Sequence, residues 1–106
     1  MKTTIYNKLI RDKIPDIIQT NNQQASVRTL SKSDYFIALK KKLVEEVEEF
    51  CESEELEELA DILEVIYALA DYANSDPASL EQLRLKKRAK RGGFEKRIFL
   101  EAVTST

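Results

Sequence analysis

The chain has 106 residues, of which 34% are charged and 42% hydrophobic, and a net charge of −2; this fits one small domain over residues 1–106. It has no histidine and one cysteine, Cys51, which excludes internal disulfides and the usual zinc sites. Two glycines and two prolines are too few for the turns of an all-β protein, so we expect an all-α fold.

The first predicted helix is short and follows Asp12. Asp12 is a candidate N-cap, and Pro15 is tolerated in the first turn of a helix. The polar run at residues 20–24 should end this helix. Residues 25–30 are too few for a further helix and include β-branched side chains, so we expect a short extended segment there.

The second predicted helix runs from about residue 34 to residue 51, with Ser31 or Ser33 as its N-cap. Its apolar residues recur every three or four positions, which is typical of one buried stripe. The stripe consists of Phe36, Leu39, Leu43, Val47 and Phe50. Glu46 and Glu49 flank it, so both can face a groove between helices.

The third predicted helix covers about residues 54–72, after a short connection at Glu52 and Ser53. A connection this short makes the two helices an antiparallel hairpin. Beyond its first two turns the third helix has almost no polar face. Because a small monomer cannot bury such a helix on all sides, we expect a homo-oligomer, either a dimer or a tetramer.

The fourth predicted helix spans about residues 78–91, capped by Ser75 or Asp76 and ended by Gly92 and Gly93. We expect its leucines to be buried, namely Leu80, Leu83 and Leu85. The apolar tail at 94–103 should dock on the domain, with an extended piece near residues 97–101 beside residues 25–30. The overall prediction is a small antiparallel bundle of about four helices.

Charge is strongly segregated along the chain. Residues 45–64 contain eleven acidic and no basic side chains, whereas residues 84–97 contain eight basic side chains and one acid. One explanation of this pattern is a pair of solvated helix faces of opposite charge that attract one another. The other is a metal site beside a phosphate site. The first residues lack a signal-peptide pattern and no stretch is long enough to span a membrane, so we expect a cytoplasmic protein.

Two pairs of carboxylates predict a metal site on the hairpin. Glu46 and Glu49, like Glu58 and Asp61, are three residues apart and therefore share a helix face. Four converging carboxylates need a cation, and without imidazole or thiolate ligands the expected ion is Mg²⁺ or Mn²⁺. Asp61 lies inside an apolar run, and a salt bridge to Lys8, Arg11 or a basic residue of the fourth helix is the alternative explanation.

Four segments of the sequence resemble the all-α nucleoside triphosphate pyrophosphohydrolases, the MazG-like enzymes and their relatives. The family motif, Glu-x-x-Glu followed by Glu-x-x-Asp, matches the acidic residues of 42–49 and 57–64. The opening residues 6–15 and the closing Arg-Gly-Gly-Phe at 91–94 look like the phosphoribosyl-ATP pyrophosphatase-like branch. The match therefore touches both ends and the middle of the chain.

The resemblance implies Mg²⁺-dependent hydrolysis between the α and β phosphates, which yields a nucleoside monophosphate and pyrophosphate. Carried over by position, the metal ligands are Glu46, Glu49, Glu58 and Asp61, and Glu45 is a candidate to position water. On charge and motif position, the expected phosphate contacts are Lys8, Arg11, Lys13, Lys87, Arg88 and Arg91. The family also implies a dimer or a dimer of dimers.

One departure leaves the substrate open. Eight residues separate Glu49 from Glu58, fewer than in MazG itself, so pocket residues on the longer connection cannot be transferred. Hydrolysis of phosphoribosyl-ATP in histidine biosynthesis is the alternative within enzymes. The alternative of another class is a non-catalytic helical dimer that binds an acidic partner or nucleic acid, although the acidic chain supports nucleic-acid binding only weakly.

Overall fold

The structure is a computed structural model that describes residues 2–105. Within them the chain forms four α-helices and no strand: α1 (Ile14–Thr20), α2 (Lys32–Ser53), α3 (Leu56–Tyr72) and α4 (Pro77–Arg91). The all-α prediction is confirmed, and each helix lies close to its predicted position. No helix in this part of the chain is long and apolar enough to cross a membrane.

Two of the predicted helix starts are confirmed by their capping bonds. The hydroxyl of Ser31 accepts the Asp34 N–H at 3.2 Å and caps α2. The carboxylate of Asp76 accepts the Ser79 N–H at 2.7 Å and caps α4. The prediction for α1 is wrong, because its N-cap is Lys13, which makes no side-chain capping bond.

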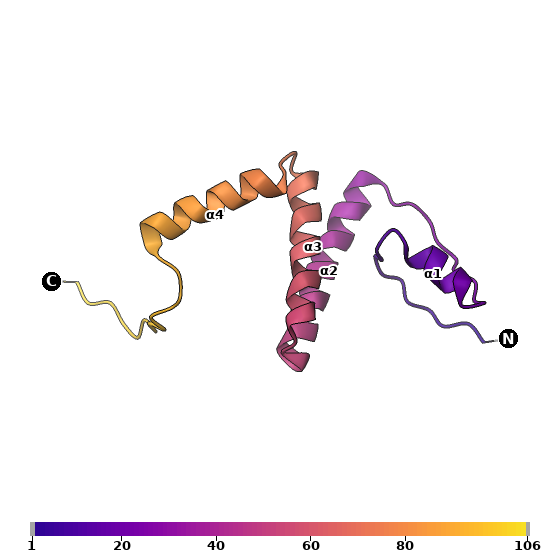
Figure 1. The fold of residues 1–106 in the computed structure, drawn as a ribbon, viewed down its shortest axis with the longest axis horizontal. Coiled ribbons are helices and arrows are strands. Elements are labelled where there is room, and N and C mark those ends of the chain that lie inside the picture. Colours follow the sequence, from indigo (N-terminus) through magenta and orange to yellow (C-terminus); the bar gives the residue numbers. More distant parts are fainter. Residues whose placement is uncertain (1, 106) are drawn as a thin grey trace.

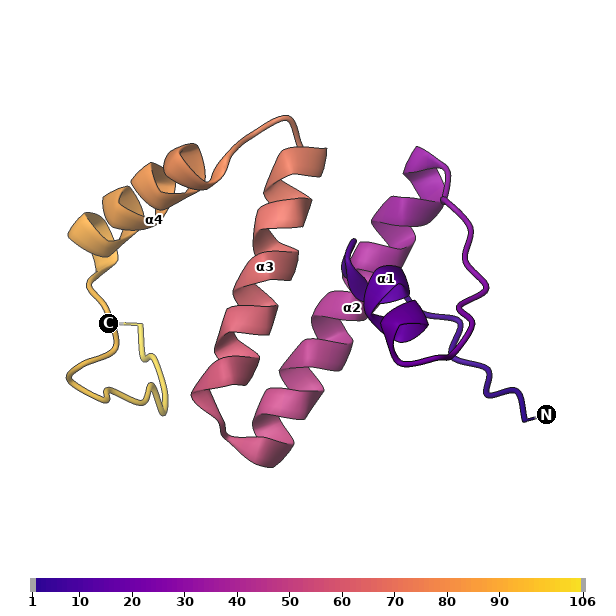
Figure 2. The ribbon, with the colours of Figure 1, turned by 45° about the vertical axis from the view of Figure 1, so that its right-hand side comes forward.

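The α2–α3 hairpin turns two residues later than predicted. Helix α2 continues through Ser53, because no residue before that point breaks it, and Glu54 adopts a left-handed conformation with φ of 59°. The Ser53 hydroxyl accepts the N–H of Glu55 inside the turn and does not cap α3. The two helices run antiparallel and side by side, as Figures 1 and 2 show.

Residues 77–103, called the α4–tail arm below, extend away from the hairpin. Helix α4 contacts α3 and, among the described helices, no other (Figure 2). Leu83 and Leu85 are half exposed, and Phe94 is almost fully exposed; the predictions of a buried α4 face and a docked tail are therefore wrong for the single chain. Residues 25–30 and 97–101 are irregular and lie at opposite ends of the molecule (Figure 1).

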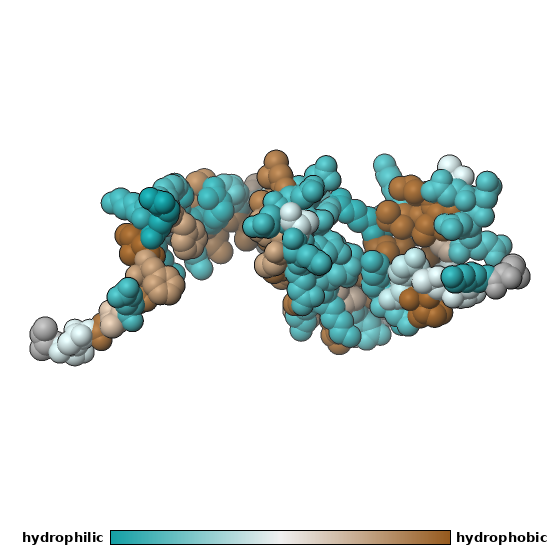
Figure 3. All heavy atoms as spheres, turned by 90° about the horizontal axis from the view of Figure 1, so that it is seen from below, coloured by the Kyte–Doolittle hydropathy of each residue, from teal (hydrophilic) through white to brown (hydrophobic). Residues whose placement is uncertain are grey.

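The single chain has a very small core. Leu39 and Val65 are the buried hydrophobic residues of the described part, and apolar side chains lie on the surface of both the arm and the rest of the chain (Figure 3). The accessible surface is 10186 Å², whereas a compact monomer of this mass exposes about 6,000 Å². The radius of gyration is 18.8 Å, against about 13 Å for a compact chain of this length.

Candidate metal centre

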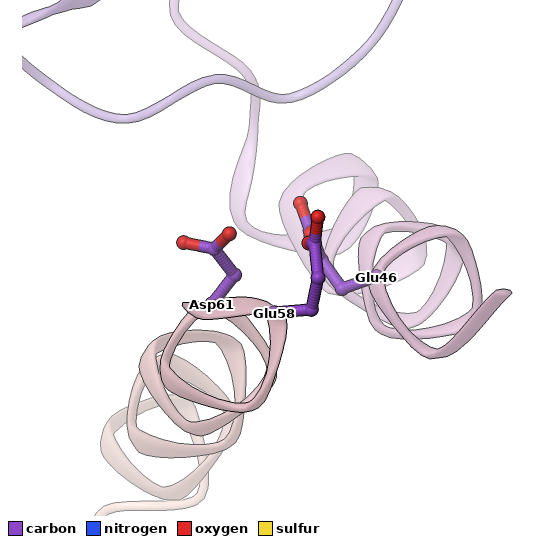
Figure 4. Close-up of side chains that lie close together, drawn as sticks. All are labelled: Glu46, Glu58 and Asp61. Carbon is purple, nitrogen blue, oxygen red and sulfur yellow. The ribbon is translucent and has the colours of Figure 1, made fainter. Parts of the chain in front are cut away.

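The antiparallel hairpin brings three of the four predicted ligands together. Glu46 comes from the middle of α2, and Glu58 and Asp61 come from the first two turns of α3. One carboxylate oxygen from each lies within 4.8 Å of the other two. Figure 4 shows the three side chains reaching toward the same space beside the hairpin. The prediction that the carboxylates converge is confirmed for this trio.

Two oxygens of this cluster are buried without a hydrogen-bond partner. They are Oε2 of Glu46 and Oε2 of Glu58. A buried polar atom that pairs with nothing costs free energy, more so when the group is charged. A hard divalent cation takes carboxylate oxygens of this kind as ligands. The residues present therefore fit Mg²⁺ or Mn²⁺.

The environment of Glu46 opposes its ionised form. Burial raises the pKa of the Glu46 carboxyl above its ordinary value, and a hydrogen bond and the charge of Glu49 add to that rise. The hydrogen bond and positive charge of Lys42 act in the opposite direction. The net pKa of Glu46 is raised, as expected for a carboxylate placed among other acids away from solvent.

Lys42 is a member of this site that sequence reasoning missed. Its ammonium lies 3.1 Å from Oε1 of Glu46 and 3.4 Å from Oε1 of Glu45. Burial lowers the pKa of Lys42, but the two glutamates outweigh burial and the net pKa is raised. The spacing of Lys42 from Glu45 and Glu46, three and four residues, is the signal that identifies such pairs on a helix.

The segment before α1 supplies two further cations. Arg11 Nη2 lies 2.6 Å from Oδ1 of Asp61, and Lys8 Nζ lies 3.4 Å from Oε1 of Glu45. A salt bridge from Asp61 to Arg11, one of the partners named in the alternative explanation of Asp61 without metal, is thus present. Two of the three predicted phosphate-binding residues of this segment, Lys8 and Arg11, thus lie beside the carboxylates, although they are 37 and 50 residues from their partners.

The remaining predicted residues lie outside the trio. Glu49 is exposed on α2, near enough to Glu46 to influence its pKa. Lys13 is at the N-cap of α1. The other basic residues predicted to bind phosphate, namely Lys87, Arg88 and Arg91, are on α4, in the arm that extends away from the hairpin (Figure 1). There Arg88 forms an ion pair with Glu95.

Two surface cavities lie away from the carboxylates. One of about 390 Å³ is formed by residues 91–98 of the arm. Another of about 260 Å³ lies between α3 and α4 and is mostly apolar, with Leu63, Ile66 and Leu80 among its lining residues. Neither includes an acidic residue of the predicted site.

Comparison with known proteins yields one partial match. A segment of 42 residues is 45% identical to an uncharacterized protein from Mycolicibacterium smegmatis. The segment is 40% of this chain and 43% of that protein, so the chain spans less than half of the relative it matches. No family model matches the chain, and no solved structure matches it significantly. Any assignment of function therefore rests on the site itself.

Proposed function

We propose that this chain is a Mg²⁺-dependent nucleotide pyrophosphohydrolase. It would hydrolyse a nucleoside triphosphate between the α and β phosphates to a nucleoside monophosphate and pyrophosphate. Phosphoribosyl-ATP is the alternative substrate, on the strength of the opening residues 6–15 and the closing residues 91–94. Mn²⁺ is an acceptable substitute ion, because it also prefers oxygen ligands.

The observation that carries this proposal is the pair of buried carboxylate oxygens without partners, Glu46 Oε2 and Glu58 Oε2. An acidic helix face that merely meets solvent gives each oxygen a water partner. Here two adjacent helices hold Glu46, Glu58 and Asp61 with oxygens within 4.8 Å of one another. Such an arrangement is costly without a cation and favourable with one.

The cations around the cluster support a phosphate substrate. Bound Mg²⁺ supplies electrostatic stabilisation of phosphate oxygens in this class of reaction. Arg11 forms an ion pair with Asp61 at the edge of the cluster. A guanidinium in this position can bind phosphate oxygens in a bidentate manner. Lys8 and Lys42 both form ion pairs with Glu45. Glu45 remains our candidate to orient the attacking water. Glu49 remains a proposed fourth acidic ligand from the exposed side of α2.

We further propose that the working form is a cytoplasmic homo-oligomer. Support comes from the small core and from a surface roughly 4,000 Å² larger than that of a compact monomer of this mass. A lone free cysteine, Cys51, suits a reducing compartment. The proposed oligomeric state and compartment are independent of the chemistry at the carboxylates.

The direct test is pyrophosphate release from a panel of nucleotides by the full chain. The panel contains the common ribo- and deoxyribonucleoside triphosphates, oxidised nucleotides and phosphoribosyl-ATP, each with Mg²⁺ and with EDTA. We expect metal-dependent release from at least one member, lost in Asp61→Asn. Glu48→Gln is the matched control, since Glu48 is an exposed acid of α2 outside the cluster.

A second candidate function has its own supporting observation. Arg11 and Lys42 already pair with Asp61 and Glu46, so part of the negative charge is neutralised by the chain itself. A non-catalytic helical dimer that binds an acidic partner or nucleic acid through its basic arm is consistent with this pairing. If no nucleotide of the panel releases pyrophosphate and Mg²⁺ does not change the thermal stability, this second function is favoured.

A further inference from the structure

The α4–tail arm carries an apolar surface that the single chain leaves uncovered. Five large hydrophobic side chains of its tail are each at least 75% exposed. They are Phe94, Ile98, Phe99, Leu100 and Val103. Isolated exposed apolar residues are ordinary, but a cluster of this size in a short segment marks a surface that binds protein.

The arm meets its own hairpin at the start of α4 and then leads away from it. Pro77, Leu80, Glu81 and Arg84, in the first two turns of α4, form one wall of the cavity beside α3, and the later turns lead away from the hairpin (Figure 2). After α4 the chain bends at Gly92, whose φ of 83° favours glycine, and the pair between Arg88 and Glu95 spans the bend. The tail is therefore directed outward.

The hairpin presents a surface that complements the arm in both hydrophobicity and charge. Its exposed large hydrophobic residues are Ile37, Val44, Val47, Leu56, Leu59 and Leu63. Residues 45–64 hold eleven acids and no base, whereas residues 84–97 of the arm hold eight bases and one acid. Opposite charges around apolar centres are the usual pattern of a specific interface.

We propose that the arm of each copy packs on the α2–α3 hairpin of a second copy of this chain. The exchange is reciprocal, as a two-fold dimer requires. The surplus of roughly 4,000 Å² of surface per chain is ample for an obligate dimer, whose interface buries about 2,000–5,000 Å² in total. The exchange brings Lys87, Arg88 and Arg91 beside the carboxylates of the partner, and this last role rests on the proposed function.

Cross-linking of the unmodified full chain tests the contact without reference to activity. Unlabelled and ¹⁵N-labelled chains are mixed, refolded together and treated with a carbodiimide, which joins ammonium to carboxylate groups in contact. We expect cross-links between an arm lysine of one isotope and a hairpin glutamate of the other. Cross-links confined to one isotope, or a solution mass of 12.2 kDa at all concentrations, would overturn the proposal.

Substitutions in the tail test the same contact by mass. Phe94→Ser combined with Phe99→Ser removes two side chains that are 96% and 86% exposed in the single chain, so the isolated fold loses little packing. We expect the dimer to dissociate, with the mass halved. Ile5→Ser, at an apolar residue near the other end that is 72% exposed, should leave the dimer intact. A dimer that survives the double substitution contradicts the exchanged arm.

The role of the arm in the partner's site is tested by mixing two inactive full-length variants. One carries Glu58→Gln, and the other carries Lys87→Ala, Arg88→Ala and Arg91→Ala. If arms act in trans, a mixed dimer has one intact site, and activity returns to at most about one quarter of the wild-type rate. No return of activity overturns this role. If the wild type is itself inactive, the proposed function fails, while the cross-links still decide the exchange.

Discussion

The ammonium of Lys42 lies 3.1 Å from Oε1 of Glu46, one helical turn further along α2, while Oε2 of the same carboxylate is buried without a hydrogen-bond partner. Only 16% of the Lys42 side chain and 9% of the Glu46 side chain are exposed. Lys42 therefore pairs with one oxygen of Glu46 and leaves the other without a partner. A charged pair this far from solvent depends strongly on both members.

Replacing Lys42 with methionine should destabilise the metal-free protein and make its stability more dependent on metal. The change leaves Glu46 buried without its cation, which should lower the free energy of unfolding by about 1–3 kcal/mol. Added Mg²⁺ should recover part of this loss. Urea unfolding with EDTA and with Mg²⁺ measures both effects. Lys41→Met is the control, because Lys41 is exposed on the same helix; equal behaviour of the two variants contradicts the assignment.

Glu46 should make the metal-free protein less stable as pH rises. Its pKa is raised, chiefly by burial, above the ordinary value of 4.5. Its contribution to stability is therefore complete below that value and is lost as pH rises through the folded-state pKa. With EDTA, we expect the melting temperature of the wild type to fall relative to that of Glu46→Gln between about pH 4 and pH 7.

The comparison with Glu46→Gln isolates this one group. Asp76, Glu81 and Glu95 have lowered pKa values, because each carboxylate accepts hydrogen bonds. Their contribution to stability is lost as pH falls, and it is the same in the wild type and in Glu46→Gln. Mg²⁺ binds the ionised carboxylate, so metal affinity of the wild type should rise over the same pH range. A melting-temperature difference that does not change with pH would rule out the raised pKa.

Periodicity and capping signals predicted the helices because these are local properties of the chain. Ser31 and Asp76 are read from a few neighbouring residues, and both caps are present. The motif also predicted that Glu46, Glu58 and Asp61 converge, since a short turn leaves few ways to pair two helices. The helix boundary at Ser53 was missed because nothing in its neighbourhood decides between a longer helix and an earlier turn.

The features that were predicted wrongly, left open or missed depend on contacts that no local pattern specifies. The burial of Leu83 and Leu85 was expected from their apolar character, but in the single chain α4 contacts only α3 among the described helices. The pairing of Arg11 with Asp61 joins residues 50 apart, and sequence reasoning left several candidate partners open. Lys42 was missed because a lysine near glutamates on a helix is usually solvent-exposed.

Glu58 and Glu49 should differ in their effect on metal binding. The motif treats the two glutamates alike, but one oxygen of Glu58 is buried within the trio and Glu49 is exposed outside it. We expect Glu58→Gln to weaken Mn²⁺ binding at least tenfold, about 1.4 kcal/mol, and Glu49→Gln to have a smaller effect. Electron paramagnetic resonance of free Mn²⁺ gives both affinities. Equal losses would indicate that Glu49 moves into the site when metal binds.

Arg11 should oppose metal binding while it assists phosphate binding. Its guanidinium occupies Oδ1 of Asp61 at 2.6 Å, so a metal ion competes with it for that oxygen. Since both side chains are about half exposed, their ion pair is worth at most about 1 kcal/mol. Arg11→Ala should therefore lower the dissociation constant for Mn²⁺ by at most about fivefold.

The same substitution should raise KM for the nucleotide, because it removes a phosphate contact, and it should leave the fold intact. Asp61→Asn, in contrast, should abolish both the stabilisation by Mg²⁺ and turnover, and it should lower metal-free stability by less than about 1 kcal/mol. Arg28→Ala is the control for the loss of one positive charge from an exposed position before α2. If Arg11→Ala weakens Mn²⁺ binding, the guanidinium supports the metal site and does not compete with it.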